Sequence, residues 1–132
     1  MGLMRGILLD THALLWWMAD DPQLGERIRT ILHEGLTPIH VSAATVWEIG
    51  IKHRLGRLPG VEDFLAEPGI CFQRWSFLPL PMDHDDARVA AALTWEHRDP
   101  FDRMLVAQSR RHQLRLASCD PAIAAYHPDC LW

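Results

Sequence analysis

The sequence is short of the residues and patterns that mark several common protein classes. It has three cysteines among 132 residues and no C-x-x-C pair, which argues against a disulfide framework and favours reduced thiols. Its eight histidines form neither an H-E-x-x-H motif nor a pair four residues apart, so a zinc site is poorly supported. No apolar run is long enough to span a bilayer, and the first residues do not resemble a signal peptide. These absences predict a cytoplasmic protein without a membrane segment.

An excess of positive charge is also missing. The net charge is −4 and the pI about 6.0, unlike the global basic field typical of DNA-binding modules. A metal enzyme acting on nucleic acid stays compatible with this charge, because bound cations and local basic patches supply attraction. The chain does have 48% hydrophobic residues, enough for one core, and six tryptophans, several of which we expect in that core. Its length predicts a single domain over residues 1–132.

Short apolar runs alternate with segments of helical periodicity along the chain. This alternation predicts an α/β fold with a short, mostly parallel sheet. In open parallel sheets, functional sites collect at the carboxyl ends of the strands. Strands are expected at 6–9, 38–41, 115–118 and 129–132, with 78–81 extended and 70–77 irregular or strand-like; helices are expected at 11–19, 25–34, 43–55, 61–66, 83–95, 100–112 and 121–126.

Four acidic residues stand where a carboxylate is unexpected. Asp10 ends the apolar run 6–9, and Glu48 interrupts a mostly apolar helix. Asp102 lies in the first turn of another expected helix, and Asp120 follows a second apolar strand. If the fold brings these carboxylates together, their mutual repulsion calls for a cation between them.

Asp10 and Glu48 each have a structural as well as a functional interpretation. Asp10 either caps the helix that follows it or serves as a metal ligand held rigidly at the end of a strand. Glu48 either pairs with Lys52, four residues away on the helix surface, or is a buried carboxylate that needs a partner.

The later acidic residues have stronger structural interpretations. Asp99 precedes Pro100, an arrangement typical of an N-cap followed by the first helical residue. Asp120 precedes Pro121 in the same way, while Asp102 projects from the first turn and is free to face a cleft. The sequence leaves open whether Asp99 is a ligand or only a cap.

As a set, the carboxylates point to a hard divalent cation. Oxygen ligands without Cys or His favour Mg²⁺ or Mn²⁺ over zinc. Such an ion activates water for attack on a phosphodiester and neutralises charge in the transition state, with one metal or two.

Four segments in order resemble PIN-domain proteins and, more narrowly, the VapC-type toxins of bacterial toxin–antitoxin pairs. They are LLDTHALLW at 8–16, VSAATVWEI at 41–49, HRDPFDRMLVAQ at 97–108 and SCD at 118–120. The resemblance implies a PIN-like α/β/α sandwich and a Mg²⁺- or Mn²⁺-dependent endoribonuclease that cuts RNA. It also implies a homodimer and an antitoxin that covers the active site.

The same resemblance assigns the site residues. Asp10, Glu48, Asp102 and Asp120 match the family's acidic quartet. Asp10 and Asp102 would be the principal metal ligands, Glu48 would complete the site and act on the water, and Asp120 would bind a second metal or hold a metal-bound water.

Two other functions compete with the nuclease. A haloacid-dehalogenase-type phosphohydrolase would use Asp10 as a nucleophile, but His12 stands where that chemistry wants a second Asp, and a later Lys has no clear candidate. A non-catalytic binding module would use the acidic residues only as helix caps.

Arg98 and Arg103 flank the acidic residues Asp99 and Asp102. They either steer RNA phosphates or balance the local charge.

Overall fold

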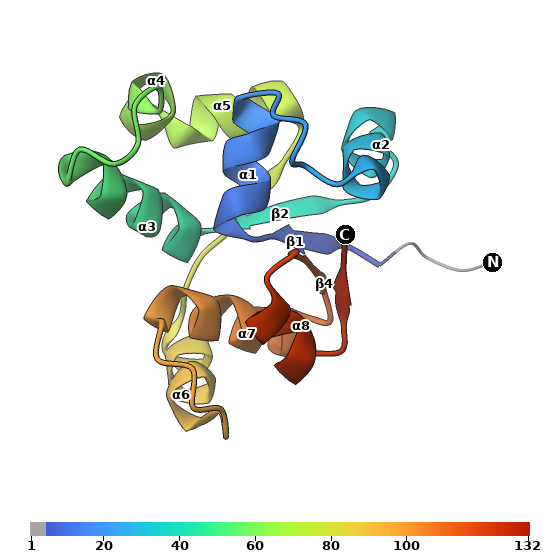
Figure 1. Cartoon of the computed structure of the whole chain (residues 1–132), viewed down its shortest axis with the longest axis vertical. Helices are drawn as coiled ribbons and strands as arrows, with labels where there is room; N and C mark the ends of the chain where they lie inside the picture. The colour runs from blue at the N-terminus through green and yellow to red at the C-terminus, as the bar shows by residue number, and fades with distance from the viewer. Residues whose placement is uncertain (1–4) are drawn as a thin grey trace.

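The structure is a computed structural model that describes residues 5–132, and the chain forms three layers with a parallel sheet in the middle (Figure 1). The predicted α/β sandwich is confirmed, and every strand pair described is parallel. The strands are β1 Ile7–Leu9, β2 Ile39–Ser42, β3 Leu78–Leu80, β4 Arg115–Ala117 and β5 Cys130–Leu131. The helices are α1 Thr11–Met18, α2 Glu26–Glu34, α3 Ala43–Arg54, α4 Glu62–Ala66, α5 Pro68–Trp75, α6 His84–Ala92, α7 Pro100–His112 and α8 Pro121–Tyr126.

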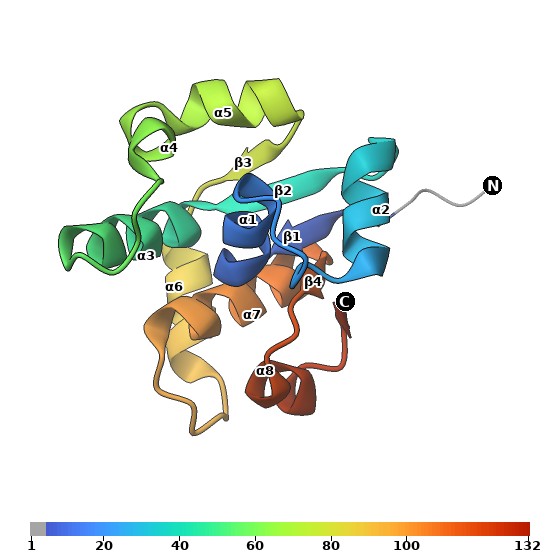
Figure 2. The ribbon, with the colours of Figure 1, turned by 45° about the horizontal axis from the view of Figure 1, so that its top comes forward.

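The strand order places β1 at the centre of the sheet. The order is β3-β2-β1-β4-β5, so the chain builds outward from β1 on one side and then returns to its other side with β4 (Figure 2). Leu9 pairs with Ala117, so the carboxyl ends of β1 and β4 are level. A reversal of strand order of this kind creates the crevice where open α/β sheets bind ligands.

The alternation of side chains along β1 divides the hydrophobic core between the two faces of the sheet. Ile7 and Leu9 join one cluster, and Leu8 joins the other. In Figure 1, α1, α2, α4 and α5 lie above the sheet and α6, α7 and α8 lie below it. All three residues of β1 are buried because helices cover both faces, as expected for a central parallel strand.

Polar N-caps begin several of the helices. Ser42 accepts a hydrogen bond from the backbone N–H of Ala44, and Asp99 and Asp120 cap α7 and α8 ahead of a proline, as predicted. Gly35 ends α2 with φ +69°, a left-handed conformation that glycine adopts without steric cost. These boundaries follow from local chemistry, and the sequence therefore predicts them.

Two segments differ from the sequence prediction. Residues 70–77 were expected to be irregular or strand-like, but α5 covers Pro68–Trp75. Pro68 begins this helix instead of ending α4, and the helix buries Cys71 and Phe72 against the core. The other difference is α6, which ends at Ala92, three residues earlier than predicted.

Four of the tryptophans, Trp16, Trp17, Trp75 and Trp132, pack against the core from its margin. All six lie among the described residues, and none is fully buried; Trp47 is 57% exposed. Trp16 packs edge-on against Trp132, and Trp17 packs against Phe77, so both lie at the margin of the core.

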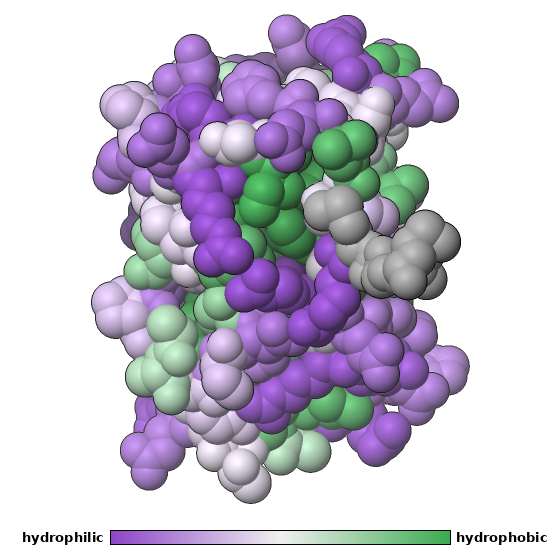
Figure 3. Space-filling view, turned by 90° about the vertical axis from the view of Figure 1, so that its right-hand side faces the viewer, coloured by the Kyte–Doolittle hydropathy of each residue, from purple (hydrophilic) through white to green (hydrophobic). Residues whose placement is uncertain are grey.

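The face turned to the viewer in Figure 3 is largely hydrophilic, with hydrophobic residues gathered near its centre. Within residues 5–132, no helix has the length and hydrophobicity needed to cross a membrane.

Arg103 explains the early end of α6. Its guanidinium donates hydrogen bonds to backbone carbonyls at the end of α6 and in the loop that leads to α7. Those carbonyls belong to Ala90 at 3.0 Å, Ala91 at 3.3 Å, Leu93 at 2.8 Å, Trp95 at 2.6 Å and His97 at 3.1 Å. Because these bonds occupy the guanidinium, Arg103 holds the loop together.

We expect Arg103→Met to lower the free energy of unfolding by about 2–4 kcal/mol, because the substitution leaves several carbonyls of the loop without their charged donor. Arg98→Met is the matched control, since Arg98 lies five residues earlier than Arg103 and is exposed. Urea denaturation of both variants measures the difference. Equal stabilities would show that the loop does not depend on Arg103.

Candidate active site

Asp10 lies at the crevice, directly after β1. Its backbone N–H donates to the carbonyl of Ala117 at 3.1 Å, which extends the pairing with β4 by one residue. Its carboxylate accepts a 2.8 Å hydrogen bond from the N–H of Ala13 and caps α1. The structural interpretation of Asp10 is therefore confirmed. The residue is only 6% exposed, which a helix cap alone does not require.

Burial changes the acidity of Asp10. It raises the pKa of the carboxyl from 3.8 to about 6, while hydrogen bonds from Ser118 and Ala13 and the charge of His12 oppose the rise. The neighbouring Asp102 raises this pKa further. An ionised carboxylate in this place is costly without positive charge nearby, which is the condition that a bound cation relieves.

Glu48 lies on α3 and is also 6% exposed. Its Oε1 accepts a 2.6 Å hydrogen bond from the hydroxyl of Thr11, the residue that follows Asp10. Its Oε2 lies 2.7 Å from the ammonium of Lys52. Both interpretations of Glu48 thus hold, because the residue pairs with Lys52 and is also buried beside the crevice.

Asp102 lies in the first turn of α7, where Asp99 is the cap. The Asp99 carboxylate accepts from the backbone N–H groups of Phe101 at 2.8 Å and of Asp102 at 3.2 Å. Asp102 itself accepts a 2.7 Å bond from Nε2 of His97. Asp99 is therefore a helix cap, whereas the Asp102 side chain is bound by His97.

The pKa of the Asp102 carboxyl is shifted by burial and by the charged groups around it. Burial raises the pKa of its carboxyl, the bond from His97 lowers it, and the charges of Asp99 and Glu48 raise it again. Asp102 in turn raises the pKa of Asp10. Asp10, Glu48 and Asp102 thus come from different parts of the chain, with Asp102 close enough to act electrostatically on Asp10 and Glu48 close enough to act on Asp102.

Asp120 is joined to Asp10 through Ser118. The buried Ser118 hydroxyl accepts a 3.1 Å bond from the backbone N–H of Asp120 and also hydrogen-bonds the Asp10 carboxylate. The Asp120 side chain caps α8 through the N–H of Ala122 at 2.9 Å. Asp120 therefore lies at the edge of the site with a confirmed structural role, and its role as a ligand stays a prediction.

The residues fit a divalent cation in their chemistry and charge. The donors are carboxylate oxygens, and burial raises the pKa of Asp10 and of Asp102. In the described part of the chain, no three Asp, Glu, His or Cys side chains are already arranged as a metal cluster. The carboxylates of Asp10, Glu48 and Asp102 each already have at least one partner, and two of the partners carry or can carry positive charge. A cation would therefore have to compete with Lys52 for Glu48 and with His97 for Asp102.

Sequence reasoning missed two residues that orient the carboxylates. Ser118 fixes Asp10, and its signal is a hydroxyl directly after a strand, two residues before Asp120. His97 fixes Asp102, and no local pattern marks it because the contact spans the turn into α7. Thr11, the first residue of α1, also orients a carboxylate, because its hydroxyl donates to Glu48.

Residues 7–127 match the PIN-domain family. The chain belongs to that family. PIN domains are nucleases, so the class of activity is hydrolysis of nucleic acid. This membership does not support the haloacid-dehalogenase alternative. A comparison with curated proteins gave no match.

Solved PIN-like structures share the fold. A toxin–antitoxin complex from Klebsiella pneumoniae contains a chain that is 20% identical, with a TM-score of 0.67 and coverage of 96% of this chain and 97% of that one. FitAcB from Neisseria gonorrhoeae is 23% identical, with a TM-score of 0.65 and coverage of 92% and 93%. At these identities the likeness establishes the fold alone.

The buried charge of Asp10 predicts a pH-dependent stability. The folded protein binds the proton of Asp10 more tightly than the unfolded chain, because the pKa rises from 3.8 to about 6 on folding. Stability is therefore lost as the pH rises through this window. In EDTA, Asp10→Asn should raise the free energy of unfolding by about 1–3 kcal/mol at pH 8 and by little near pH 4.

Asparagine keeps the helix cap, so the substitution isolates the charge. Asp120→Asn is the control, because it changes a helix cap that is less buried than Asp10. Thermal unfolding at both pH values measures the effect. A gain at pH 8 no larger than the gain at pH 4 would contradict the buried-charge account of Asp10.

Proposed function

We propose that the chain is a Mg²⁺- or Mn²⁺-dependent endoribonuclease of the cytoplasm and the toxin of a toxin–antitoxin pair. The observation that carries this proposal is the burial of Asp10 at the crevice of a PIN domain, within electrostatic reach of Asp102. A buried carboxylate whose pKa is raised by desolvation and by a like charge is typical of a functional site.

Each carboxylate has a proposed role and a residue that orients it. Asp10, fixed by Ser118, and Asp102, fixed by His97, are the metal ligands. Glu48, fixed by the Thr11 hydroxyl, completes the site and orients the attacking water. Asp120 extends the site at its edge. The bound cation supplies positive charge for phosphodiester hydrolysis, which carboxylates alone do not provide.

The choice of a hard ion is supported by the side chains assigned to the site. Asp10, Glu48 and Asp102 offer carboxylate oxygens, which favour Mg²⁺ or Mn²⁺.

The proposed partners are an antitoxin and a second copy of the chain. The fold is similar to a chain of a complex that is described as toxin–antitoxin, which supports the first. Exposed hydrophobic side chains support protein contacts in general, because tryptophan and other large apolar residues are enriched at interfaces. Trp47, which packs edge-on against Phe101, is the largest of these.

The purified chain should cleave single-stranded RNA with Mg²⁺ or Mn²⁺ and lose that activity in EDTA. Asp10→Asn and Asp102→Asn should each reduce the rate at least ~100-fold, because each removes a charge that binds the cation. Asp99→Asn is the matched control, since asparagine also caps a helix. It should stay within a few-fold of the wild-type rate, and gel analysis of a labelled RNA measures all three.

Full activity of Asp10→Asn, or cleavage that persists in EDTA, would contradict the proposal. A stable phospho-aspartate on the wild-type protein would favour the phosphohydrolase instead. Equal losses in Asp99→Asn and Asp102→Asn would contradict the assignment of the ligand to Asp102.

A further inference from the structure

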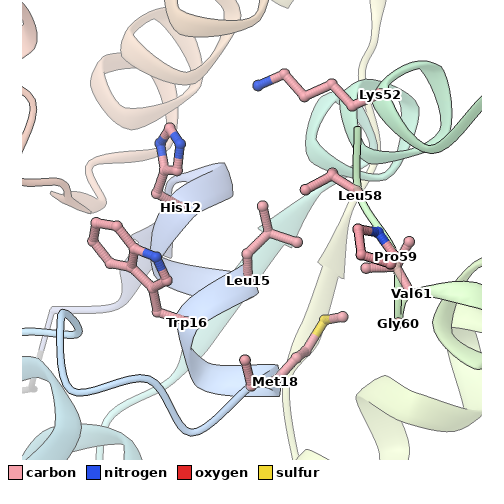
Figure 4. Close-up of a pocket in the computed structure, with 10 residues that line it drawn as sticks. His12, Leu15, Trp16, Met18, Lys52, Leu58, Pro59, Gly60 and Val61 are labelled. Carbon is pink, nitrogen blue, oxygen red and sulfur yellow. The ribbon is translucent and has the colours of Figure 1, made fainter. Parts of the chain in front are cut away.

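A cavity of about 350 Å³ lies beside the acidic residues, between α1 and the segment 58–61 (Figure 4). This volume is in the range of pockets that bind small molecules or parts of larger ligands. Figure 4 shows the α1 side chains on one side, Leu58 to Val61 on the other, and Lys52 reaching from α3 between them. The cavity therefore has three walls of different chemistry.

Aromatic rings form the α1 wall. The rings of His12 and Trp16 lie one helical turn apart, with centroids 5.4 Å from each other and planes inclined by 34°. His12 is exposed, and Trp16 is held from behind by the edge of Trp132 at 5.7 Å. Opposite them lie apolar surfaces of Leu58 and Val61. Walls of this kind offer aromatic and apolar surface to a flat, uncharged group.

The cavity is directly connected to the acidic site at two points. Lys52, which lines the cavity, is the residue whose ammonium lies 2.7 Å from Glu48. His12 follows Thr11, whose hydroxyl donates to the same Glu48 carboxylate. An RNA strand with a phosphodiester at the acidic site would therefore have an adjacent nucleotide beside this cavity.

The net charge of the protein favours a contact that does not depend on phosphate charge. A chain of net charge −4 gains little from general attraction to phosphates, and its site repels them further. Base stacking on aromatic side chains supplies affinity that does not depend on net charge.

We propose that this cavity binds one nucleobase of the RNA, next to the phosphodiester that is cut. His12 and Trp16 provide the stacking surface, and Lys52, which also lines the cavity, contacts the adjoining phosphate. The inference rests on the proposed ribonuclease function and adds to it a substrate-positioning subsite built by α1, α3 and the segment 58–61.

Binding in the absence of metal tests the subsite without relying on catalysis. In EDTA, His12→Ala and Trp16→Ala should weaken binding of a fluorescently labelled single-stranded RNA by roughly 5- to 100-fold, as expected for the loss of one stacked base. Trp16→Phe should retain most of the affinity. His84→Ala, an exposed histidine on α6, is the matched control and should bind like the wild type.

RNA that lacks one base identifies the subsite more sharply. An oligonucleotide that is cleaved by the wild type is prepared with an abasic nucleotide at each position in turn. One position near the cut should raise the KM of the wild type and leave that of His12→Ala and Trp16→Ala unchanged. If Trp16→Ala does not fold, by circular dichroism, His12→Ala carries the comparison, because its side chain is exposed.

The two proposals fail in different ways. If the wild type cleaves no RNA with Mn²⁺, the ribonuclease function fails. If it cleaves RNA, but the abasic effect is the same in the wild type and in His12→Ala, the ribonuclease stands and the nucleobase subsite is overturned. Unchanged RNA binding by Trp16→Ala also overturns the subsite and leaves the cavity to a protein partner.

Discussion

The architecture of the site depends on one buried carboxylate. Asp10 follows the central strand β1, donates its backbone N–H to β4 and caps α1 with its side chain, so it is fixed to three elements at once. The same position removes it from water and raises its pKa to about 6. A buried charge of this kind weakens the fold unless positive charge accompanies it, and such a trade of stability for activity is common at active sites.

The other carboxylates are arranged around Asp10, and each has a polar partner. Thr11 orients Glu48, His97 orients Asp102, and Ser118 links Asp10 to the backbone of Asp120. These partners orient the carboxylates in the absence of a ligand. A cation would compete with Lys52 for Glu48 and with His97 for Asp102. Lys52 neutralises Glu48 and lines the neighbouring cavity, so one side chain connects the acidic site with the proposed nucleobase subsite.

Local chemistry made much of the fold and the acidic residues predictable. The caps Ser42, Asp99 and Asp120 followed from residue type and from the prolines after two of them. Local patterns failed where a distant contact decides the outcome: Arg103 ends α6 by binding its carbonyls, and Pro68 starts a helix that tertiary packing of Phe72 stabilises. The partners of the carboxylates escaped prediction for the same reason, because hydrogen bonds such as that of His97 form only after the loops are placed. The sequence identified the acidic residues of the site, and the structure identified the side chains that hydrogen-bond to them.

The central claim is that Asp10 and Asp102 together hold a divalent cation. Anomalous diffraction from a crystal soaked in Mn²⁺ tests it most directly, because manganese is located by its own signal whatever the substrate or partner. The account predicts a peak between the two carboxylates, within about 2.0–2.6 Å of an oxygen of each, as oxygen-coordinated divalent ions require. A crystal that takes up Mn²⁺ elsewhere, or that shows no peak between Asp10 and Asp102, would contradict it.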